Sequence, residues 1–307
     1  MVGKEYAITT YNIGFGAYNH DFSFFMDQGK MLSGEKVKGK LSKATSKEIV
    51  LTNTRGAIEE ITAFNPDFAF FQEVDTNSTR SFQVNQFKML QESLAKMASV
   101  HVSNFHSAYL FYPILDPHGV VNSGIATFSK YKIDKVIRKS LEITDAFPSK
   151  FFDLDRCFSA SYLKTNHDNY LVIVNVHLSA YDKGGVYRKK QLQQLNSFLE
   201  VEYQKGNYVV CGGDFNHDIA NSMYVFETKQ EKPEWVYALN NDDLNENFSF
   251  ATNNNIPTCR STDMPYEKNV NYTVVLDGFI VSKNVDVIMV ENVDTNFEYS
   301  DHNPVYM

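Results

Sequence analysis

Cysteine is scarce in this sequence, and long hydrophobic runs are missing from it. The chain of 307 residues has three cysteines, Cys157, Cys211 and Cys259, without C-x-x-C spacing. An odd number at such spacing argues against a disulfide framework and a cysteine-based zinc site, so we expect reduced, structural thiols. No stretch approaches the ~20 apolar residues of a membrane span, and the N-terminus has no apolar stretch of signal-peptide length. These absences favour a cytoplasmic protein without a transmembrane segment.

Basic residues are also in short supply. Lys and Arg total 29 against 37 Asp and Glu, which gives a formal net charge of -8. This balance argues against a long basic track that grips duplex nucleic acid through its phosphates. It does not exclude a nucleic-acid substrate, because a few well-placed cations and a bound metal can hold a phosphate in an acidic protein. Nothing in the sequence indicates an obligate protein partner.

Apolar and aromatic residues, in contrast, are plentiful enough for a large core. The chain is 43% hydrophobic and contains 24 Phe and 18 Tyr. The length would allow two average domains, but no linker and no internal repeat stand out, so we predict one domain over 1–307. Short β-type runs outnumber helical patterns, which favours an α/β fold of two packed sheets with helices outside. The predicted strands cover 6–13, 68–71, 107–112, 125–128, 170–176, 208–211, 273–281 and 285–290.

Three helices are predicted from apolar periodicity and capping signals. The first begins at the capping-box sequence Thr45-Ser46-Lys47-Glu48 and stops before Pro66. Apolar residues three or four positions apart predict a second helix over 84–97 and a third over about 186–205, before a glycine suited to end it. The polar stretch 240–255 is predicted to be a long surface loop within the domain.

The segment 17–43 separates the first strand from the first helix and is predicted to be an insertion at the mouth of the site. It is either a lid or specificity loop, with His20, Asp21 and Asp27 as its candidate residues, or a tolerated surface insertion. Residues 34–40 nearly match a phosphate-binding P-loop. The hydroxyl that should hold Mg²⁺ is replaced by a leucine, and no buried strand leads into the loop, so the match is expected to be fortuitous.

Polar side chains follow several of the predicted strands. Asp214 comes after a buried strand that ends in two glycines, and Asn216 lies two positions further on. Asn12, Glu73 and His177 each end an apolar strand. One such residue is more often solvated, part of a turn or a satisfied core histidine than catalytic. Together, however, four strand ends with groups that bind metal or phosphate indicate a site.

A second acid and a histidine occur near the C-terminus. Asp277 lies within the apolar run 274–280, where an unpaired carboxylate would be costly, so it should have a partner. His302, in Ser300-Asp301-His302, is a candidate, because carboxylates hold and polarise catalytic imidazoles. If Glu73, Asp214 and Asp301 converge, each like-charged pair ~4 Å apart costs about 4 kcal/mol at an effective dielectric constant of 20, a penalty that a bound cation removes.

These motifs, in this order, resemble those of the endonuclease/exonuclease/phosphatase superfamily, which includes deoxyribonuclease I, abasic-site endonucleases, deadenylases, inositol phosphate phosphatases and neutral sphingomyelinases. The similarity extends from residue 11 to residue 304 and implies a four-layer sandwich of two mixed sheets flanked by helices. The motifs are Tyr11-Asn12-Ile13, Gln72-Glu73-Val74, Asn175-Val176-His177-Leu178, Gly213-Asp214-Phe215-Asn216, Leu276-Asp277-Gly278 and Ser300-Asp301-His302.

The resemblance also implies a role for each residue. Glu73 would ligate Mg²⁺, with Asn12 and Asp301 beside it. Oxygen-only ligands suit Mg²⁺ or Mn²⁺ better than Zn²⁺. The catalytic set would be as follows: Asp214 orients or deprotonates the attacking water, Asn216 and His177 bind phosphate oxygens, and His302, held by Asp277, stabilises the charge of the transition state.

Three further residues have open interpretations. Arg156 precedes the strand before the one that ends at His177, and it fits a substrate-phosphate contact or a surface ion pair equally well. His217 and Asp218 either line the site or belong to a helix N-terminal turn.

The sequence therefore predicts a metal-dependent phosphoesterase and favours a phosphodiester over a phosphomonoester as its substrate. Its substrate would be a nucleic acid, a nucleotide, or a lipid or inositol headgroup. Inositol phosphatase and sphingomyelinase-like activities belong to the same superfamily and remain alternatives. Alternatives of another class are an inactive binding protein that kept the fold and a nucleotide-binding protein that uses 34–40.

Overall fold

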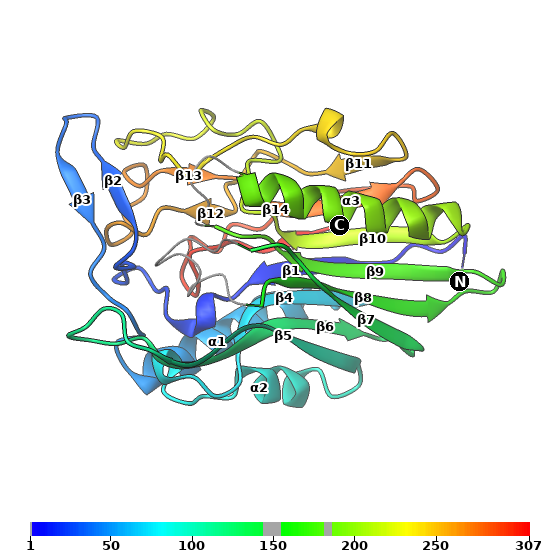
Figure 1. The fold of residues 1–307 in the computed structure, drawn as a ribbon, viewed down its shortest axis with the longest axis horizontal. Coiled ribbons are helices and arrows are strands. Elements are labelled where there is room, and N and C mark those ends of the chain that lie inside the picture. Colours follow the sequence, from blue (N-terminus) through cyan, green and yellow to red (C-terminus); the bar gives the residue numbers. More distant parts are fainter. Residues whose placement is uncertain (1, 144–154, 181–185) are drawn as a thin grey trace.

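Two six-stranded β-sheets lie face to face, and helices cover their outer faces (Figure 1). The computed structural model describes residues 2–143, 155–180 and 186–307. The predicted α/β sandwich of two mixed sheets flanked by helices is confirmed. No helix in these ranges is long and apolar enough to cross a membrane. The three cysteines are buried and free of disulfides, as expected.

The first sheet has the strand order β15-β16-β1-β4-β6-β5. Strands β1 and β4 are parallel, and the other pairs are antiparallel. The outer face of this sheet packs against helices α1 and α2, through apolar residues such as Ile58, Ile61 and Leu90. The elements are β1 Ile8–Asn12, β4 Phe68–Asp75, β5 Ala98–Leu110, β6 Gly119–Ser129, β15 Glu291–Asn292, β16 Val305–Tyr306, α1 Lys47–Ala63 and α2 Gln86–Ser93.

The second sheet has the order β11-β14-β10-β9-β8-β7, with β9 and β10 parallel. Helix α3 covers its outer face with Leu192, Leu195 and Leu199. The elements are β7 Lys135–Ser140, β8 Cys157–Lys164, β9 Tyr170–His177, β10 Tyr208–Asp214, β11 Phe248–Ala251, β14 Asp277–Ser282 and α3 Val186–Gln204. Shorter elements are β2 Gln28–Lys30, β3 Lys36–Lys38, β12 Cys259–Arg260, β13 Thr273–Val274, and the 3-10 turns Gly14–Gly16, Thr79–Ser81 and Asn241–Asp243.

The inner faces of the two sheets share one apolar cluster and a polar bridge. The cluster includes Phe70 from β4 and Phe279 from β14, both fully buried. The bridge joins Gln72 of β4 to Asn175 of β9. The Gln72 Nε2 donates to Asn175 Oδ1 at 2.8 Å, and the Asn175 Nδ2 donates to the carbonyl of Ala126 in β6 at 2.9 Å. These bonds fix the two sheets against each other directly beneath their polar edge.

Several predicted element boundaries are wrong. The N-cap of α1 is Ser46, one residue later than the capping box implied, because the Ser46 hydroxyl accepts the Ile49 N–H. Helix α2 is much shorter than 84–97, since the chain turns into β5 directly after it. The run 273–281 is interrupted between β13 and β14. Residues 285–290 form no strand.

The two predicted loops contain regular structure. The stretch 240–255 includes β11, the edge strand of the second sheet. The insertion 17–43 contains the antiparallel hairpin β2–β3. Gly34 occupies the tip of this hairpin with φ +92° and is followed by β3, so a helix N-terminus for phosphate binding is absent there. The near-match to a P-loop is thus fortuitous, as expected.

Candidate active site

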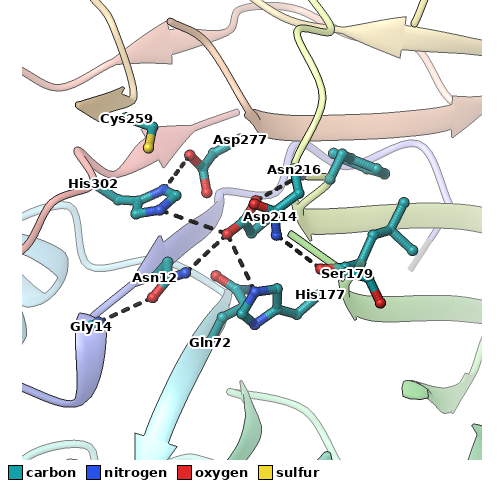
Figure 2. Close-up of polar contacts among 12 residues, drawn as sticks. Asn12, Gly14, Gln72, His177, Ser179, Asp214, Asn216, Cys259, Asp277 and His302 are labelled. Carbon is teal, nitrogen blue, oxygen red and sulfur yellow. Dashed lines mark hydrogen bonds and ion pairs between the residues drawn. The ribbon is translucent and has the colours of Figure 1, made fainter. Parts of the chain in front are cut away.

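The polar side chains that follow the strands meet at one edge of the sandwich. Because β1 and β4 are parallel, and β9 and β10 are parallel, the carboxyl ends of each pair point the same way. The two sheets are joined at this edge by the side chain of Asn12, whose Nδ2 donates to Asp214 Oδ2 at 2.9 Å (Figure 2). Residues at the ends of β1 and β10, some two hundred positions apart, are therefore in direct contact.

Asp214 is the centre of this constellation. It is buried, and its Oδ1 accepts the backbone N–H of Asn216 at 2.8 Å. Its Oδ2 lies 3.5 Å from His177 Nε2 and 3.7 Å from His302 Nε2. Figure 2 shows the two imidazoles on either side of this carboxylate. A single carboxylate thus faces two histidines and two amide donors.

The predicted pairing of Asp277 with His302 is present. Asp277 begins β14 directly opposite Asp214 in the antiparallel register. Its Oδ2 accepts the Nδ1–H of His302 at 2.7 Å. This hydrogen bond fixes the orientation of the imidazole ring and directs its Nε2 at Asp214. The other oxygen of Asp277, Oδ1, is buried and has no hydrogen-bond partner among the described residues.

The two histidines have opposite electrostatic surroundings. Burial lowers the pKa of His177 well below its usual value, and the charge of Arg156 adds to this effect. Burial acts in the same direction on His302, but Asp277 and Asp214 outweigh it and raise the pKa of His302 well above its usual value. Burial also raises the pKa of Asp214 to about 6, although the positive charge of His302 opposes this shift. His302 is therefore a cation beside a carboxylate that titrates close to neutral pH.

Glu73 and Asp301 form an acidic pair on the other side of the pocket. Glu73 lies at a bulge between β4 and β6, with φ 54°, a left-handed conformation that costs about 1–3 kcal/mol for a residue with a side chain. Asp301 is half-buried and lines the pocket. Burial and the negative charge of Glu73 together raise the pKa of Asp301 to about 7, against the opposing effect of His302. A bound cation would stabilise the ionised form of Asp301 beside this second carboxylate.

The donors at this pair fit a hard divalent cation. Glu73 and Asp301 line the pocket and offer oxygen atoms alone, which Mg²⁺ and Mn²⁺ prefer. Gly14 leaves room beside them, because a Cβ at this position would lie 3.0 Å from Asp301 Oδ1. Asn12 Oδ1 already accepts the Gly14 N–H at 3.0 Å, so only its second lone pair is available to a metal.

A second set of donors is close by. One oxygen each of Asp214 and Asp277 and one nitrogen of His302 lie within 4.8 Å of one another, and all three residues are buried. His302 and Asp277 of this set are already joined by the hydrogen bond from Nδ1 to Oδ2. A cation that used either of these two atoms would have to displace that hydrogen bond, so the set is better suited to moving and stabilising charge than to holding a metal.

The pocket itself has a volume of about 110 Å³ and is lined by cationic and aromatic side chains as well as by the acids. Arg156 lines it, next to β8, as one of its two predicted roles requires. Arg80 and Arg260 also line it and are buried, but no sequence signal marked them. Arg80 is paired with Asp75, with Nη2 2.9 Å from Oδ1. The sequence does not show whether an arginine is buried or solvated, so only the structure distinguishes these two from surface arginines.

Of the three neighbouring candidates Asn216, His217 and Asp218, the structure places only the first in the pocket lining. Asn216 lines it, and its Nδ2 donates one hydrogen to the Leu178 carbonyl at 2.8 Å. Asp218 instead holds a turn, where its carboxylate accepts the backbone N–H groups of residues 220, 222 and 223. His217 bonds the carbonyl of Phe215 at 2.7 Å. Asp218 therefore belongs to a turn, but the predicted helix is wrong, because no helix begins there and Asp218 forms a β-bridge with Ala238.

Only one residue of the insertion's candidate trio lines the pocket. Asp27 does so and is bonded to the hydroxyl of Thr262, another lining residue. His20 bonds the carbonyl of Asn296 at 2.7 Å, away from the pocket. Asp21 is exposed. The insertion thus contributes part of the pocket wall through Asp27.

Comparison with known proteins agrees with this architecture. A model of the endonuclease/exonuclease/phosphatase family matches residues 9–302. An inositol phosphosphingolipids phospholipase C of Schizosaccharomyces pombe is 24% identical over 245 residues, which are 70% of this chain and 58% of that protein. The chain thus spans less than two thirds of the length of this relative.

Solved structures show the same fold at low identity. A truncated TDP2 of Caenorhabditis elegans has a TM-score of 0.59 at 15% identity, over 99% of this chain and 96% of the other. The human Nocturnin catalytic domain has a TM-score of 0.57 at 17% identity, over 98% and 91%. The chain therefore belongs to the endonuclease/exonuclease/phosphatase family.

Proposed function

We propose that this protein hydrolyses a phosphodiester by attack of a water molecule, with Mg²⁺ or Mn²⁺ as its cofactor. The observation that supports this most directly is the position of Asp214. It is held between Asn12, His177 and His302, and it faces the same pocket as the acidic pair Glu73 and Asp301. The pocket thus combines a base, a cation at a fixed imidazole and a donor set for a divalent metal.

The acidic pair would hold the metal. Glu73 and Asp301 supply carboxylate oxygens, and Asn12 supplies the remaining lone pair of its amide oxygen. When bound, the cation offsets the negative charge of the phosphoryl oxygens. Asn12 also links this donor set to the base, because its amide nitrogen donates to Asp214.

Asp214 would orient the attacking water and accept its proton. With a pKa of about 6 it is deprotonated at neutral pH and is still basic enough to take a proton in the transition state. The amide donors of Asn12 and Asn216 hold the carboxylate so that one oxygen remains directed at the two imidazoles.

The histidines and Asn216 would bind the phosphate oxygens. His302 stays protonated, so its Nε2–H donates to an oxygen whose negative charge grows in the transition state. His177 is neutral and donates or accepts without adding charge. Asn216 has a second amide hydrogen that Leu178 does not use. Arg156 would contact the phosphate from the β8 side of the pocket.

A diester is favoured over a monoester by charge. A monoester carries up to two negative charges and would meet the pocket's acids Asp27, Glu73, Asp214 and Asp301 with more repulsion than a singly charged diester. The relative from Schizosaccharomyces pombe is named for a phospholipase C activity, which is also cleavage of a diester. Nucleic acids and lipid headgroups both offer such a bond.

The test is metal-dependent hydrolysis of bis(p-nitrophenyl) phosphate by the wild-type chain and by Asp214→Asn. We expect hydrolysis with Mg²⁺ or Mn²⁺, loss on chelation, and a kcat at least ~1000-fold lower in the variant, since base and water alignment are lost together. The near-isosteric Asp218→Asn, in the turn, serves as the control for local perturbation. The proposal would be refuted if Asp214→Asn hydrolysed the substrate as the wild type does, or if removing the metal with a chelator left the rate unchanged.

A further inference from the structure

Within the described part of the chain, the largest group of exposed apolar side chains lies at the end of β5 and in the connection to β6. Phe111, Ile114 and Leu115 are 75%, 84% and 99% exposed, and Tyr109 and Tyr112 are also exposed. We call residues 109–115 the apolar tip. A soluble surface seldom gathers five large apolar residues within seven positions, and such a patch marks an interaction site.

The apolar tip projects from the edge of the sandwich that contains the pocket. Strand β6 pairs with the end of β4, where Ser123 lies opposite Asp75, two residues after Glu73. From Ser123 the hairpin continues to the last pair, Leu110 with Gly119, which is ~13 Å further for four residues of extended strand. The tip therefore stands beyond the mouth of the pocket.

A second protrusion, the β2–β3 hairpin, stands at the same end of the molecule (Figure 1). Leu32, in its turn, is 66% exposed. Residues 28–43 hold five lysines and a single acid, although the whole chain has a net charge of -8. Among the described residues no ion pair involves Lys36, Lys38 or Lys40. The hairpin is thus a local excess of positive charge on an acidic protein, and we call residues 28–43 the basic hairpin.

The apolar tip and the basic hairpin are in contact where they leave the body of the molecule. The rings of Phe25 and Tyr112 lie 5.5 Å apart. The Ser42 hydroxyl donates to the carbonyl of Asp116 at 2.7 Å, and the His118 Nδ1–H donates to the carbonyl of Ser42 at 2.6 Å. His118 itself lines the pocket. These contacts fix the apolar tip, the basic hairpin and the pocket wall relative to one another.

We propose that the apolar tip and the basic hairpin together dock the pocket onto an anionic phospholipid surface. Exposed aromatic and aliphatic side chains enter the boundary between headgroups and acyl chains, and neighbouring lysines bind the anionic headgroups. The mouth of the pocket then faces the layer in which the phosphates of lipids lie. The substrate class is a membrane phospholipid whose headgroup is joined through a phosphodiester. This inference rests on the proposed hydrolysis of phosphodiesters and extends it to a substrate class.

The chemistry of this surface distinguishes a bilayer from other occupants. A nucleic acid would match the lysines but leave the apolar tip in water, and a protein groove would match the tip but not need the unpaired lysines. A bilayer with anionic headgroups satisfies both at once.

The test is co-sedimentation of the intact chain with vesicles of phosphatidylcholine, alone or mixed with phosphatidylserine. We expect binding to the mixed vesicles that weakens as salt is added. The variants Phe111→Ser/Leu115→Glu and Lys36→Glu/Lys38→Glu should each reduce this binding more than about tenfold, since each removes apolar burial or charge attraction. All four side chains are exposed or half-buried and lie outside the catalytic residues, so hydrolysis of bis(p-nitrophenyl) phosphate should stay at the wild-type rate.

Matched controls lie at the opposite end of the sandwich. Ile288 is 73% exposed and Lys283 is exposed, and both follow β14, far from the pocket edge. Ile288→Glu and Lys283→Glu should bind vesicles as the wild type does. The inference is overturned if the wild type fails to bind mixed vesicles, if control and hairpin variants lose binding equally, or if the apolar tip captures a protein and no vesicle. Loss of soluble hydrolysis in the wild type would instead count against the proposed activity.

Discussion

The two pocket histidines differ in the charge that each carries at neutral pH. His302 contacts Asp277 at 2.7 Å and is held protonated, while His177 lies 3.5 Å from Asp214 and is held neutral by burial. The same side chain therefore supplies a cation on one side of Asp214 and a neutral polar group on the other. The difference follows from one acid, Asp277, at the start of β14.

Replacing that acid tests the role of charge at His302. In Asp277→Asn the hydrogen bond can persist, but the negative charge is gone, so burial will lower the pKa of His302. Because the protonated imidazole is the proposed active form, the basic limb of the pH–rate profile should move to lower pH. Activity at pH 8 then falls at least ~10-fold more than activity at pH 6. The measurement is kcat/KM against pH with bis(p-nitrophenyl) phosphate.

His302→Ala is the reference for this variant, with an expected loss of at least ~100-fold in kcat, the contribution of one oxyanion-type donor. A loss of tenfold or less would remove His302 from the mechanism. Parallel pH profiles for wild type and Asp277→Asn would show that Asp277 orients the ring without setting its charge.

At this scale the sequence predicted which residues carry polar groups at strand ends, and the structure brings Asn12, His177 and Asp214 together. Proposed roles for them remain predictions. Arg80 and Arg260 were not predicted as site residues, because neither comes directly after a long strand. Their significance comes from burial beside the pocket, which depends on packing between segments far apart in the sequence.

At the scale of elements, the site depends on how closely β9 and β10 approach. Gly213, just before Asp214, has φ +145°, and a Cβ there would lie 2.0 Å from the carbonyl oxygen of Val176. The missing side chain thus lets the two strands pair next to His177 and Asp214. The position of Asp214 therefore depends on the glycine at 213 as well as on strand β10.

Gly213→Ala should therefore damage both stability and activity. The added Cβ must push β10 from β9, and we expect a loss of about 2–4 kcal/mol in the free energy of unfolding, from strain and overpacking. Metal-dependent hydrolysis should fall even below the melting temperature, because Asp214 moves relative to His177. Urea unfolding and initial rates measure the two effects.

Gly206→Ala is the matched control. Its φ is +81°, but nothing lies within 4 Å of an added Cβ. It should lose only about 1–2 kcal/mol from backbone strain and keep its activity. Equal effects of the two substitutions would mean that φ, and not the approach of the strands, explains the need for glycine at 213.

Long buried strands were predicted better than short or edge elements. β4, β9 and β10 are continuous apolar runs, and their residues alone identify them. β11 lies in a stretch rich in Asn and Asp and becomes a strand only because β14 offers a partner. The opposite error occurred at the apolar run 285–290, which was predicted to be a strand. It pairs with no strand of the described residues, and much of it is exposed. Whether these two segments form strands depends on a pairing partner, which the sequence of one segment does not reveal.

At the scale of the whole molecule, a buried polar bridge joins the two sheets. Gln72 bonds Asn175 across the interface at 2.8 Å, and Asn175 also donates to β6. Gln72 immediately precedes Glu73, and Asn175 lies two residues before His177. The bridge therefore sets the relative position of the two halves of the site.

A double-mutant cycle measures this coupling. Asn175→Leu and Gln72→Leu each leave buried polar groups unpaired, and each should destabilise the fold by about 2–3 kcal/mol. The double variant removes both partners and should be more stable than the sum implies, by ~1 kcal/mol or more. Urea unfolding of the four proteins gives the coupling energy. Strict additivity would show that the bridge contributes nothing beyond its separate contacts.

Strand β1 has a neighbour on one side, β16, that comes from the far end of the sequence. During synthesis at roughly 5–20 residues per second, about 230 residues separate the appearance of Glu73 from that of His302, a delay of roughly 10–50 s. Throughout that interval one edge of β1 is open, and the imidazole that we propose to bind the phosphate has not yet been made. A fragment left by a stalled ribosome or by a protease cut upstream of 302 would keep the glutamate proposed to bind the metal, and we expect it to be inert.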